Sequence, residues 1–566
     1  MSDADARDSS HVHWLLLGSL SPTPSGRRFV LDAETFAETF TAAKLGAKLD
    51  VGPSLGAGRV HEVEVGFAKL RDYSIKHVLA SIPVLAQLRE LADALGKPSS
   101  KRPSDEAAVD RVVELIGDGD LAAELRKVFA GDDDAASTPE TEADASKPSE
   151  APTGDDNADL VGELLDSHER KKEEAKQVVD SFIAAIRGKR ASAKGSKPPP
   201  ANRRARELIE TAIYGSVTAV LNHPAVTEPE ALWRGLHLVV KHAPRKAGML
   251  VEIVDVGPDG IEAAIRACLD DEPMNRPDTY FCFDRIEDSP RMQAIASLAE
   301  DMHAPVVMGV GPRFFGVDDA EDIIPHMRAA EPDASAVLPE DYAQLRADEV
   351  SRWLALTVND VVVAAEGAGA ARRTVLGSCV FALAAMIAAS YHHTGAFARI
   401  LGKEGSLKAP GLREVQKGRE AGATVPTAAF LSIRAQAELA ENGFIGLGSG
   451  RNTDMVALSD VRTVRAAKDA VILPAQILTG RLVRFGLWVA DQVPDGSTKD
   501  EVVELFKQAA TVFLFPGLSA GAELHAGVID EGQGPAIRLV ANVNPRLAGA
   551  PFEVGFDLPL SATLAD

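Results

Sequence analysis

The sequence predicts an α/β protein with α+β elements, built from two modules with mixed sheets and flanking helices. From Met249 onward, short apolar stretches alternate with amphipathic stretches of helical spacing. This order is typical of a mostly parallel sheet covered by helices. The chain of 566 residues is also too long for a single hydrophobic core, and strongly polar segments divide it.

The first module is expected at residues 1–130. It begins with short apolar runs, and the stretch 61–67 alternates between apolar and polar or small residues, which indicates a strand with one buried face. Asp32 is a suitable N-cap for a helix. The expected elements are strands at 13–17 and 29–31, a helix after Asp32, strands at 49–51 and 61–67, and a helix from Pro83 to Gly96.

Three segments are expected to separate the modules. Residues 131–157 carry acidic and small residues without a large apolar side chain, and this composition predicts a disordered acidic linker. Residues 158–186 predict a helix whose first apolar face is formed by Leu160, Val161, Leu164 and Leu165. Residues 187–206 are basic and proline-rich, which is typical of a semi-stiff linker. The second module then covers 207–566.

The second module is organised around residues 220–244. Pro224 and Pro229 predict that one helix stops near Asn222 and that a new, buried helix covers 231–240. Beyond it we expect strands at 249–254, 279–283 and 304–310, helices at 261–269 and 292–301, a buried helix at 375–389, and strands at 536–543 and 552–558.

Charge and cysteine usage exclude several classes of partner. The formal net charge of -23 argues against nucleic acid and anionic membranes, which are polyanions. Cys268, Cys282 and Cys379 have no CxxC spacing and lie in apolar runs, so we expect reduced core residues in a cytoplasmic protein. The segment 375–389 is shorter than the roughly 18 residues of a membrane span, and the N-terminus lacks the apolar region of a signal peptide.

Candidate catalytic motifs are weak. Residues 361–373 suggest a strand, a glycine turn and a helix, as in a dinucleotide loop, but Arg372 occupies the place of the third glycine. His11 with His13, and His392 with His393, lack carboxylates or cysteines at metal-ligand spacing. His303 is expected to be a satisfied core residue. The sequence therefore predicts no enzyme, cofactor or metal, and a nucleotide-binding enzyme stays as the alternative of another class.

Several phrases resemble the contractile sheath subunits of bacterial type VI secretion. The phrase H-P-x5-E-A-x-W-R-G-L, which contains Trp233, Arg234, Gly235 and Leu236, is similar to the signature of the large (TssC/VipB-like) subunit. Further phrases of that subunit match around His303 and Pro305, Pro426, and Gly443 with Phe444. Upstream, W-L-L-L-G-S-L and G-F-A-K-L-R-D-Y-S-I-K-H-V-L-A-S-I-P-V-L resemble the small (TssB/VipA-like) subunit. The chain thus resembles a natural fusion of the two subunits.

This resemblance implies a structural protein of the type VI secretion system. Copies would assemble by strand exchange into a cytoplasmic helical tube around an inner tube of the haemolysin-coregulated-protein (Hcp) kind. Baseplate components and a ClpV-type AAA+ unfoldase are the further implied partners. The unfoldase is expected to bind the helix with Leu160, Val161, Leu164 and Leu165, for which ordinary packing within the protein is the alternative.

One departure leaves a second possibility open within the same apparatus. The family's small subunit carries an extended N-terminal segment that supplies an exchanged strand, whereas only residues 1–12 precede His13 here. A sheath-like adaptor, cap or regulator that does not polymerise is therefore the alternative function.

Overall fold

The computed structural model confirms the α/β class. It describes residues 12–21, 23–97, 102–130, 200–330, 337–367, 373–466, 471–514, 522–530, 535–545 and 551–565. Internal contacts divide the chain into two units. Unit 1 comprises Met1–Thr39, Ala231–Ala365 and Thr374–Asp566, and unit 2 comprises Phe40–Glu230 and Glu366–Arg373. The predicted linkers and the helix at 158–186 lie almost entirely outside the described residues, so the predicted domain boundaries stay a prediction.

A seven-stranded sheet forms the centre of unit 1. Its strands run parallel except for β2, which is antiparallel at one edge. Their order is β14 (Phe444–Gly446), β8 (Leu354–Val358), β7 (Val306–Gly309), β6 (Thr279–Cys282), β1 (Val12–Gly18), β5 (Met249–Asp255) and β2 (Arg28–Val30). All seven residues of β1 are buried. The continuous apolar run is explained by this place, because a central parallel strand is covered on both faces.

Helices cover the sheet. Leu15 and Tyr280 belong to a core with Ile261 and Ile295 from the helices that follow β5 and β6. Helix α14 (Cys379–Thr394) packs against β6, β7 and β8, and its apolar residues surround it completely, as expected for a buried helix. The other helices of this part are α10 (Ile261–Arg266), α11 (Ser289–Asp301), α12 (Ile323–Ala329), α13 (Tyr342–Ala347) and α15 (Ile433–Glu441).

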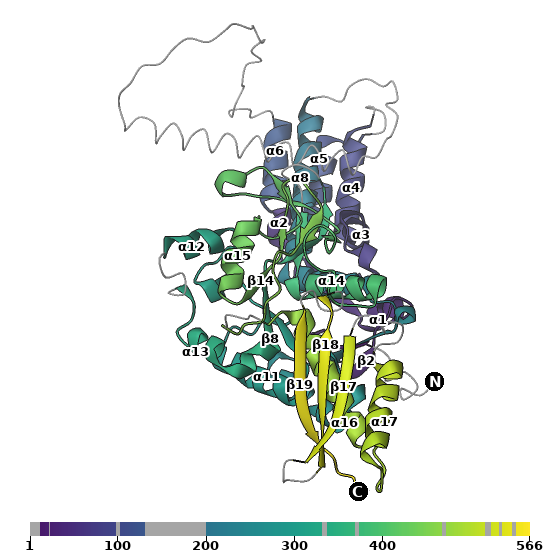
Figure 1. Ribbon diagram of the computed structural model, residues 1–566. Coiled ribbons are helices and arrows are strands. Elements are labelled where there is room, and N and C mark those ends of the chain that lie inside the picture. Colours follow the sequence, from purple (N-terminus) through teal and green to yellow (C-terminus); the bar gives the residue numbers. More distant parts are fainter. Residues whose placement is uncertain are drawn as a thin grey trace, which may run out of the picture. The chain divides into compact units, whose positions relative to one another are not determined.

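The C-terminal part of unit 1 is a second layer of helix and sheet. The strands β17 (Ala522–Asp530), β18 (Pro535–Val543) and β19 (Phe552–Pro559) form an antiparallel sheet in that order, drawn as yellow arrows in Figure 1. Their inner face shares one apolar core with α16 (Leu473–Ala490) and α17 (Lys499–Phe513). The predicted strands at 536–543 and 552–558 are confirmed, whereas β17 and α17 were not predicted.

Small sheets complete the first unit. Strand β9 (Val361–Glu366) pairs with β10 (Arg373–Gly377). The helix predicted at 375–389 is therefore wrong at its start, because residues 375–377 are strand and Ser378 caps α14 by accepting from the Val380 amide. The remaining short strands are β11 (Leu407–Lys408), β12 (Arg413–Glu414), β13 (Thr424–Val425), β15 (Gly448–Ser449) and β16 (Met455–Ala457).

Unit 2 is a helical bundle with one hairpin. Helix α8 (Pro200–Asn222) is its central element and packs against α2, α3, α4 and α6. The elements from the front of the chain are hairpin β3 (Leu45–Asp50) and β4 (Glu62–Phe67), α2 (Gly52–Leu55), α3 (Ile75–Ser81), α4 (Pro83–Leu95), α5 (Asp105–Ile116) and α6 (Asp120–Ala130). Residues before 131 and residues after 199 thus share one apolar bundle.

The chain passes from one unit to the other four times, in β9, in β10 and in two helices. Helix α1 (Phe36–Ala42) follows Asp32, whose Oδ1 accepts from the amides of Glu34 and Thr35. Helix α9 (Pro224–His242) begins seven residues before the predicted start at Ala231. The prediction was wrong because Pro224 stands at the first helical position, where amides lack intrahelical partners. Pro229 lies inside the helix and does not end it.

Candidate functional site

The signature residues of α9 pack inside unit 1. Trp233 is 1% exposed and meets the edge of Phe36 at 5.8 Å between ring centroids. Gly235 allows Phe381 of α14 to pack directly on the backbone of α9, because a Cβ at residue 235 would lie 2.2 Å from the Phe381 ring. Leu236 is fully buried, whereas Arg234 is half-buried. These residues therefore join α9 to its neighbours and form no exposed site.

His303 and Pro305 form the turn that leads into β7. His303 has a left-handed backbone, with φ of 50°, and the Pro305 carbonyl accepts from the Tyr280 amide at 3.0 Å. Burial, followed by the positive charge of Arg484, lowers the pKa of the His303 imidazole. The ring is half-buried, and its Nδ1 has no hydrogen-bond partner among the described residues. The predicted core histidine is therefore only half-buried, with its ring centroid 6.3 Å from that of Trp353.

The remaining signature residues also support the core. The Pro426 carbonyl accepts from the Val362 amide at 2.8 Å. Gly443 has φ of 84° and lies against the Tyr342 hydroxyl, where a side chain would crowd. Phe444 is 1% exposed and stacks on Tyr342 at 5.2 Å. The resembling phrases thus mark buried packing positions that are spread over unit 1, and the structure does not bring them together.

An ionic cluster lies under the first residues of β1. Glu252 of β5 is buried, and its Oε2 lies 2.7 Å from both His13 Nε2 and Arg28 Nη2. Burial alone would raise the pKa of Glu252, but the hydrogen bonds and charges of His13 and Arg28 outweigh it and lower the pKa to about 2. The carboxylate therefore stays ionised and binds together three neighbouring strands, β1, β5 and β2.

A second buried cluster is centred on Asp278, the residue before β6. Its carboxylate accepts from the His13 amide and from Arg481 Nη1, both at 2.8 Å, and from Arg484 Nη2. Arg484 Nη1 also donates to the Pro277 carbonyl at 2.6 Å. Burial lowers the pKa of the Arg484 guanidinium, and the charge of Asp278 opposes this effect. Both arginines come from α16, which sequence reasoning did not connect to β1.

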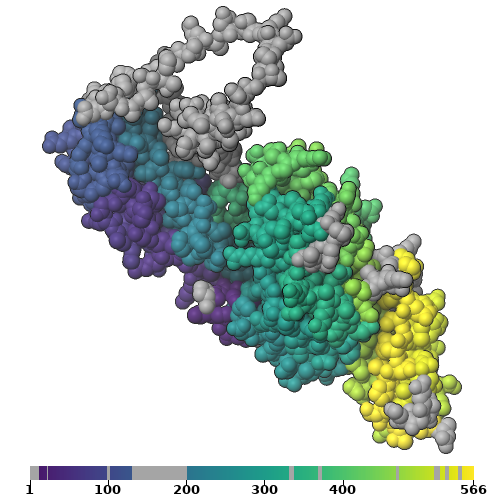
Figure 2. All heavy atoms as spheres, turned by 90° about the vertical axis from the view of Figure 1, so that its left-hand side faces the viewer, coloured from purple at the N-terminus to yellow at the C-terminus, as the bar shows by residue number. Residues whose placement is uncertain are grey.

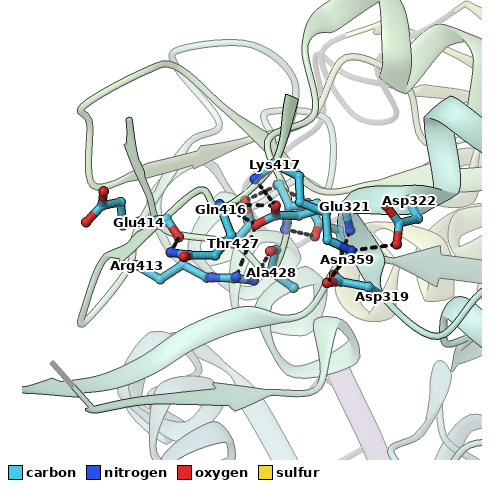
Figure 3. A network of polar contacts seen from close by, with 11 residues as sticks. Asp319, Glu321, Asp322, Asn359, Arg413, Glu414, Gln416, Lys417, Thr427 and Ala428 are labelled. Atoms are coloured by element: carbon cyan, nitrogen blue, oxygen red, sulfur yellow. Dashed lines mark hydrogen bonds and ion pairs between the residues drawn. The ribbon is translucent and has the colours of Figure 1, made fainter. Parts of the chain in front are cut away.

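A third polar network fixes the hairpin formed by β12 and β13 (Figure 3). The Glu321 side chain is only 4% exposed and accepts from the Gln416 and Lys417 amides and from Arg413 Nη2. Lys417 Nζ lies between Asp319 Oδ2 at 3.1 Å and Asp322 Oδ2 at 2.7 Å. The buried carboxylate fixes the backbone of the hairpin, while the lysine contacts lie in solvent, where ion pairs contribute little.

The sheet of β17, β18 and β19 has two edge strands that no other named strand of the described chain extends. Figure 2 shows its yellow residues exposed on one surface of the molecule. The inner faces of the two edge strands carry apolar residues that are only partly buried, among them Leu524, Val528, Val554 and Phe556. Regular edges of eight and nine residues with half-covered apolar rows are suited to accept a further strand.

Other sequence candidates give no catalytic constellation. The segment 361–373 joins two paired strands, so the strand-to-helix turn of a dinucleotide loop is contradicted. The three cysteines are buried and unpaired, and burial raises the pKa of each thiol. Over the residues described, no group of three or more histidine, cysteine or acidic side chains has metal-binding geometry, and no helix is long and apolar enough to cross a membrane. The predicted unfoldase helix with Leu160, Val161, Leu164 and Leu165 lies outside the described residues.

Part of the chain matches a known family, and one known protein is similar over more than half of the chain. Residues 278–465 match the family described as VipB: EvpB/VC_A0108, tail sheath N-terminal domain. The type VI secretion system sheath protein TssC1 of Pseudomonas aeruginosa is 22% identical over 363 residues, which cover 55% of this chain and 72% of that protein. The matched family region holds the strands from β6 to β16, including the Glu321 network.

Solved structures of contractile injection systems are similar at low scores. The baseplate of the anti-feeding prophage matches with a TM-score of 0.31 and 12% identity over 58% of this chain and 76% of that chain. Its contracted helical sheath matches with a TM-score of 0.29 and 13% identity over 59% and 79%. The family and TssC1 matches support a structural, sheath-type protein that is similar to the large sheath subunit of type VI secretion.

Proposed function

We propose that this protein is one protomer of a contractile type VI sheath, in which a small-subunit-like front and a large-subunit-like remainder are joined in one chain. Copies assemble by strand addition into a cytoplasmic helical tube around an Hcp-like inner tube, attached to baseplate components. The protein performs mechanical work and no chemical step. The family match over 278–465 and the relation to TssC1 support the large-subunit part.

The position of β1 carries the fusion part of the proposal. Residues 12–18 resemble the start of a small subunit, yet they pair on one side with β5 and on the other with β6. A strand in the middle of a parallel sheet cannot leave without breaking two ladders and exposing a continuous apolar run. The shared sheet of residues 12–18 with β5 and β6 supports the proposed fusion into one protomer.

The open edges of the C-terminal sheet support the assembly mode. Added strands would complete main-chain hydrogen bonds and cover the partly buried apolar rows on β17 and β19. If one copy donates a strand to the edge of the next, the two copies use different surfaces, and such a contact gives an open helical assembly when the rotation does not close.

Electron microscopy of the purified chain tests this proposal, with proline variants in β19 as a matched pair. In an antiparallel edge strand, successive amides point alternately to the neighbouring strand and outward. Val554→Pro and Gly555→Pro change successive residues, so one of them removes an outward amide and the other removes an amide that points to β18. The variant that loses only the outward amide should keep wild-type thermal stability. We expect wide tubes from the wild type and no tubes from this variant.

Monodisperse small particles from the wild type under all conditions would instead favour the adaptor, cap or regulator. Equal tube formation by the wild type and both folded proline variants would contradict strand addition at β19.

We also propose that a ClpV-type unfoldase recognises the segment with Leu160, Val161, Leu164 and Leu165, whose apolar spacing suits a helix in a groove. A synthetic peptide of residues 158–186 should bind the unfoldase's N-terminal domain in a calorimetric titration. Leu164→Asp in that peptide should abolish binding, and Glu173→Gln, a change of a charged residue outside the apolar set, should not. Equal binding of both peptides would contradict this assignment.

A further inference from the structure

Asp278 connects three segments that are far apart in the sequence. Its amide donates to the His13 carbonyl at 2.6 Å, and its carboxylate accepts from the His13 amide at 2.8 Å. These two bonds extend the β1–β6 ladder by one residue, with the Asp278 carboxylate accepting the bond that a backbone carbonyl would otherwise accept. The start of β1 is therefore held by a buried carboxylate rather than by backbone alone.

The same carboxylate holds α16. Arg481 and Arg484 reach it with side chains that are 7% and 2% exposed. Arg484 also donates to the His303 carbonyl at 3.2 Å, and Gly480 brings the helix so close that a Cβ would lie 2.0 Å from that oxygen. Buried arginines with fixed planar groups are well suited to define one docking geometry.

The C-terminal sheet lies on other residues of the same helix. Gly486 lies against Leu539, Leu558 and Phe556, and the sheet shares its apolar core with α16. Within unit 1, α16 is therefore packed on the sheet that bears the open edges and is bound by ion pairs to the start of β6. No other helix of the described chain has both its apolar core in this sheet and a buried ion pair to the seven-stranded sheet.

We propose that the cluster of Asp278, Arg481 and Arg484 is the force-transmitting junction between the C-terminal sheet and the central sheet. Tension on β17–β19 reaches the body through α16 and arrives at Asp278, which also binds the amide and carbonyl of His13, the second residue of β1. The three residues are positioning residues that keep the C-terminal sheet in register with the body when neighbouring copies pull on it. The proposal deepens the proposed assembly, but it concerns a single chain.

Single-molecule pulling on the unpolymerised chain tests the junction. Handles are attached at Glu553→Cys on β19 and Ser297→Cys on α11, both exposed positions, while the native cysteines are buried. At constant force, Asp278→Asn should shorten the lifetime of the contact between C-terminal sheet and body at least tenfold. The matched control is Arg538→Gln, which removes an exposed ion pair to Asp557 within the same sheet and should change the lifetime less than twofold.

Hydrogen exchange distinguishes local loosening of the junction from a loss of stability throughout the protein. Asp278→Asn should accelerate exchange at the His13 amide and in α16 together, while the amides of β7 and β8 keep their protection. If Asp278→Asn fails to fold, Asp278→Leu with Arg481→Met and Arg484→Met replaces the charges by apolar groups, a change that buried ionic triads often tolerate.

The folded triple variant should still lose protection at His13 and show the shortened lifetime. Wild-type lifetimes in either folded variant would overturn the proposal. These measurements need no polymer. A wild-type chain that forms no tubes would therefore contradict the proposed function, whereas the junction is tested by the lifetimes and exchange rates of the single chain.

Discussion

At the scale of single residues, Glu252 shows how a charge can be retained in a parallel sheet. It lies in a strand in which all seven residues are buried. Its cost of burial is offset by His13 and Arg28, which both lie 2.7 Å from the same carboxylate oxygen. A neutral residue in place of Glu252 leaves His13 buried without this carboxylate, and Arg28 keeps only its ion pair with Asp271 at 3.1 Å. A neutral replacement should therefore be destabilising.

We predict that Glu252→Gln lowers the free energy of unfolding by about 3 kcal/mol at pH 7, since a pKa lowered from 4.5 to about 2 corresponds to this order. The folded-state pKa lies below the unfolded value. The stabilisation is therefore complete above pH 4.5 and is lost as the pH falls toward 2. Urea unfolding between pH 7 and pH 2.5 measures it, with exposed Glu553→Gln as control. A difference that stays constant with pH would contradict the assignment.

Gly480 offers a second test at one position. An added methyl group would lie 2.0 Å from the His303 carbonyl oxygen, so α16 must move outward. Gly480→Ala should lower the free energy of unfolding by about 1–3 kcal/mol, the usual cost of overpacking. Gly527→Ala on β17 is the control, because no atom lies within 4 Å of its added Cβ. Calorimetric melting of both variants is the measurement, and equal melting temperatures would contradict the close approach.

At the scale of elements, the hairpin of β12 and β13 depends on one buried carboxylate. Glu321 accepts from two successive amides, those of Gln416 and Lys417, as well as from Arg413. Lys417 is about half exposed, so its two ion pairs are screened by salt, whereas the contacts of Glu321 are sheltered. The hairpin should therefore stay closed in salt and open when Glu321 loses its charge.

We predict that Glu321→Gln makes the hairpin at least fivefold more sensitive to trypsin at Lys417 and Arg419. Lys417→Gln, which removes only the exposed pairs, should leave cleavage at Arg419 within twofold of the wild type. Mass spectrometry of timed digests gives both rates, at 0.1 M and 1 M salt. Cleavage of the wild type that rises strongly with salt would show that the exposed pairs hold the hairpin instead.

Among the elements, the sequence predicted the buried strands of the central sheet but missed or misplaced some helices. Apolar runs predicted β1, β5, β6 and β7 because a buried parallel strand leaves a continuous signal. Helix α17 was missed although Thr498 and Glu501 form a capping box, which is a readable start signal. The start of α14 was wrong because Val375 is apolar in a strand as in a helix, and only pairing with β9 separates the two.

Residues brought together over long distances could not be predicted. The cluster at Asp278 joins His13 and Arg484, which are more than 200 positions apart from Asp278 in either direction. In the sequence, Arg481 and Arg484 look the same as arginines on the exposed face of an amphipathic helix. The phrases around His303, Pro426 and Gly443 fall within the region 278–465 that matches the family, whereas the phrase with Gly235 lies before it. These phrases marked buried packing positions, while the polar clusters and the open edges became visible only in the fold.

At the scale of the whole molecule, the chain does not divide where its composition changes. The first unit takes residues from the front, the middle and the end, and the second unit combines helices before residue 131 with α8 after residue 199. The central place of β1 and the packing of α8 on α2, α3, α4 and α6 are two separate attachments of the front to the remainder. Each would have to break before the two parts could separate.

We therefore predict that a chain cut once between residues 131 and 157 keeps both pieces together. A specific protease site inserted there is cleaved to completion, and the nicked protein should elute from a sizing column at the volume of the intact chain. Separation should require urea concentrations near the unfolding midpoint, because β1 is paired on both sides and fully buried. Leu16→Asp in β1 removes one of the two attachments, so this nicked variant should separate at a lower urea concentration, whereas exposed Glu64→Gln on β4 should not. Release of the front piece from the nicked wild type in plain buffer would contradict the fused-protomer arrangement.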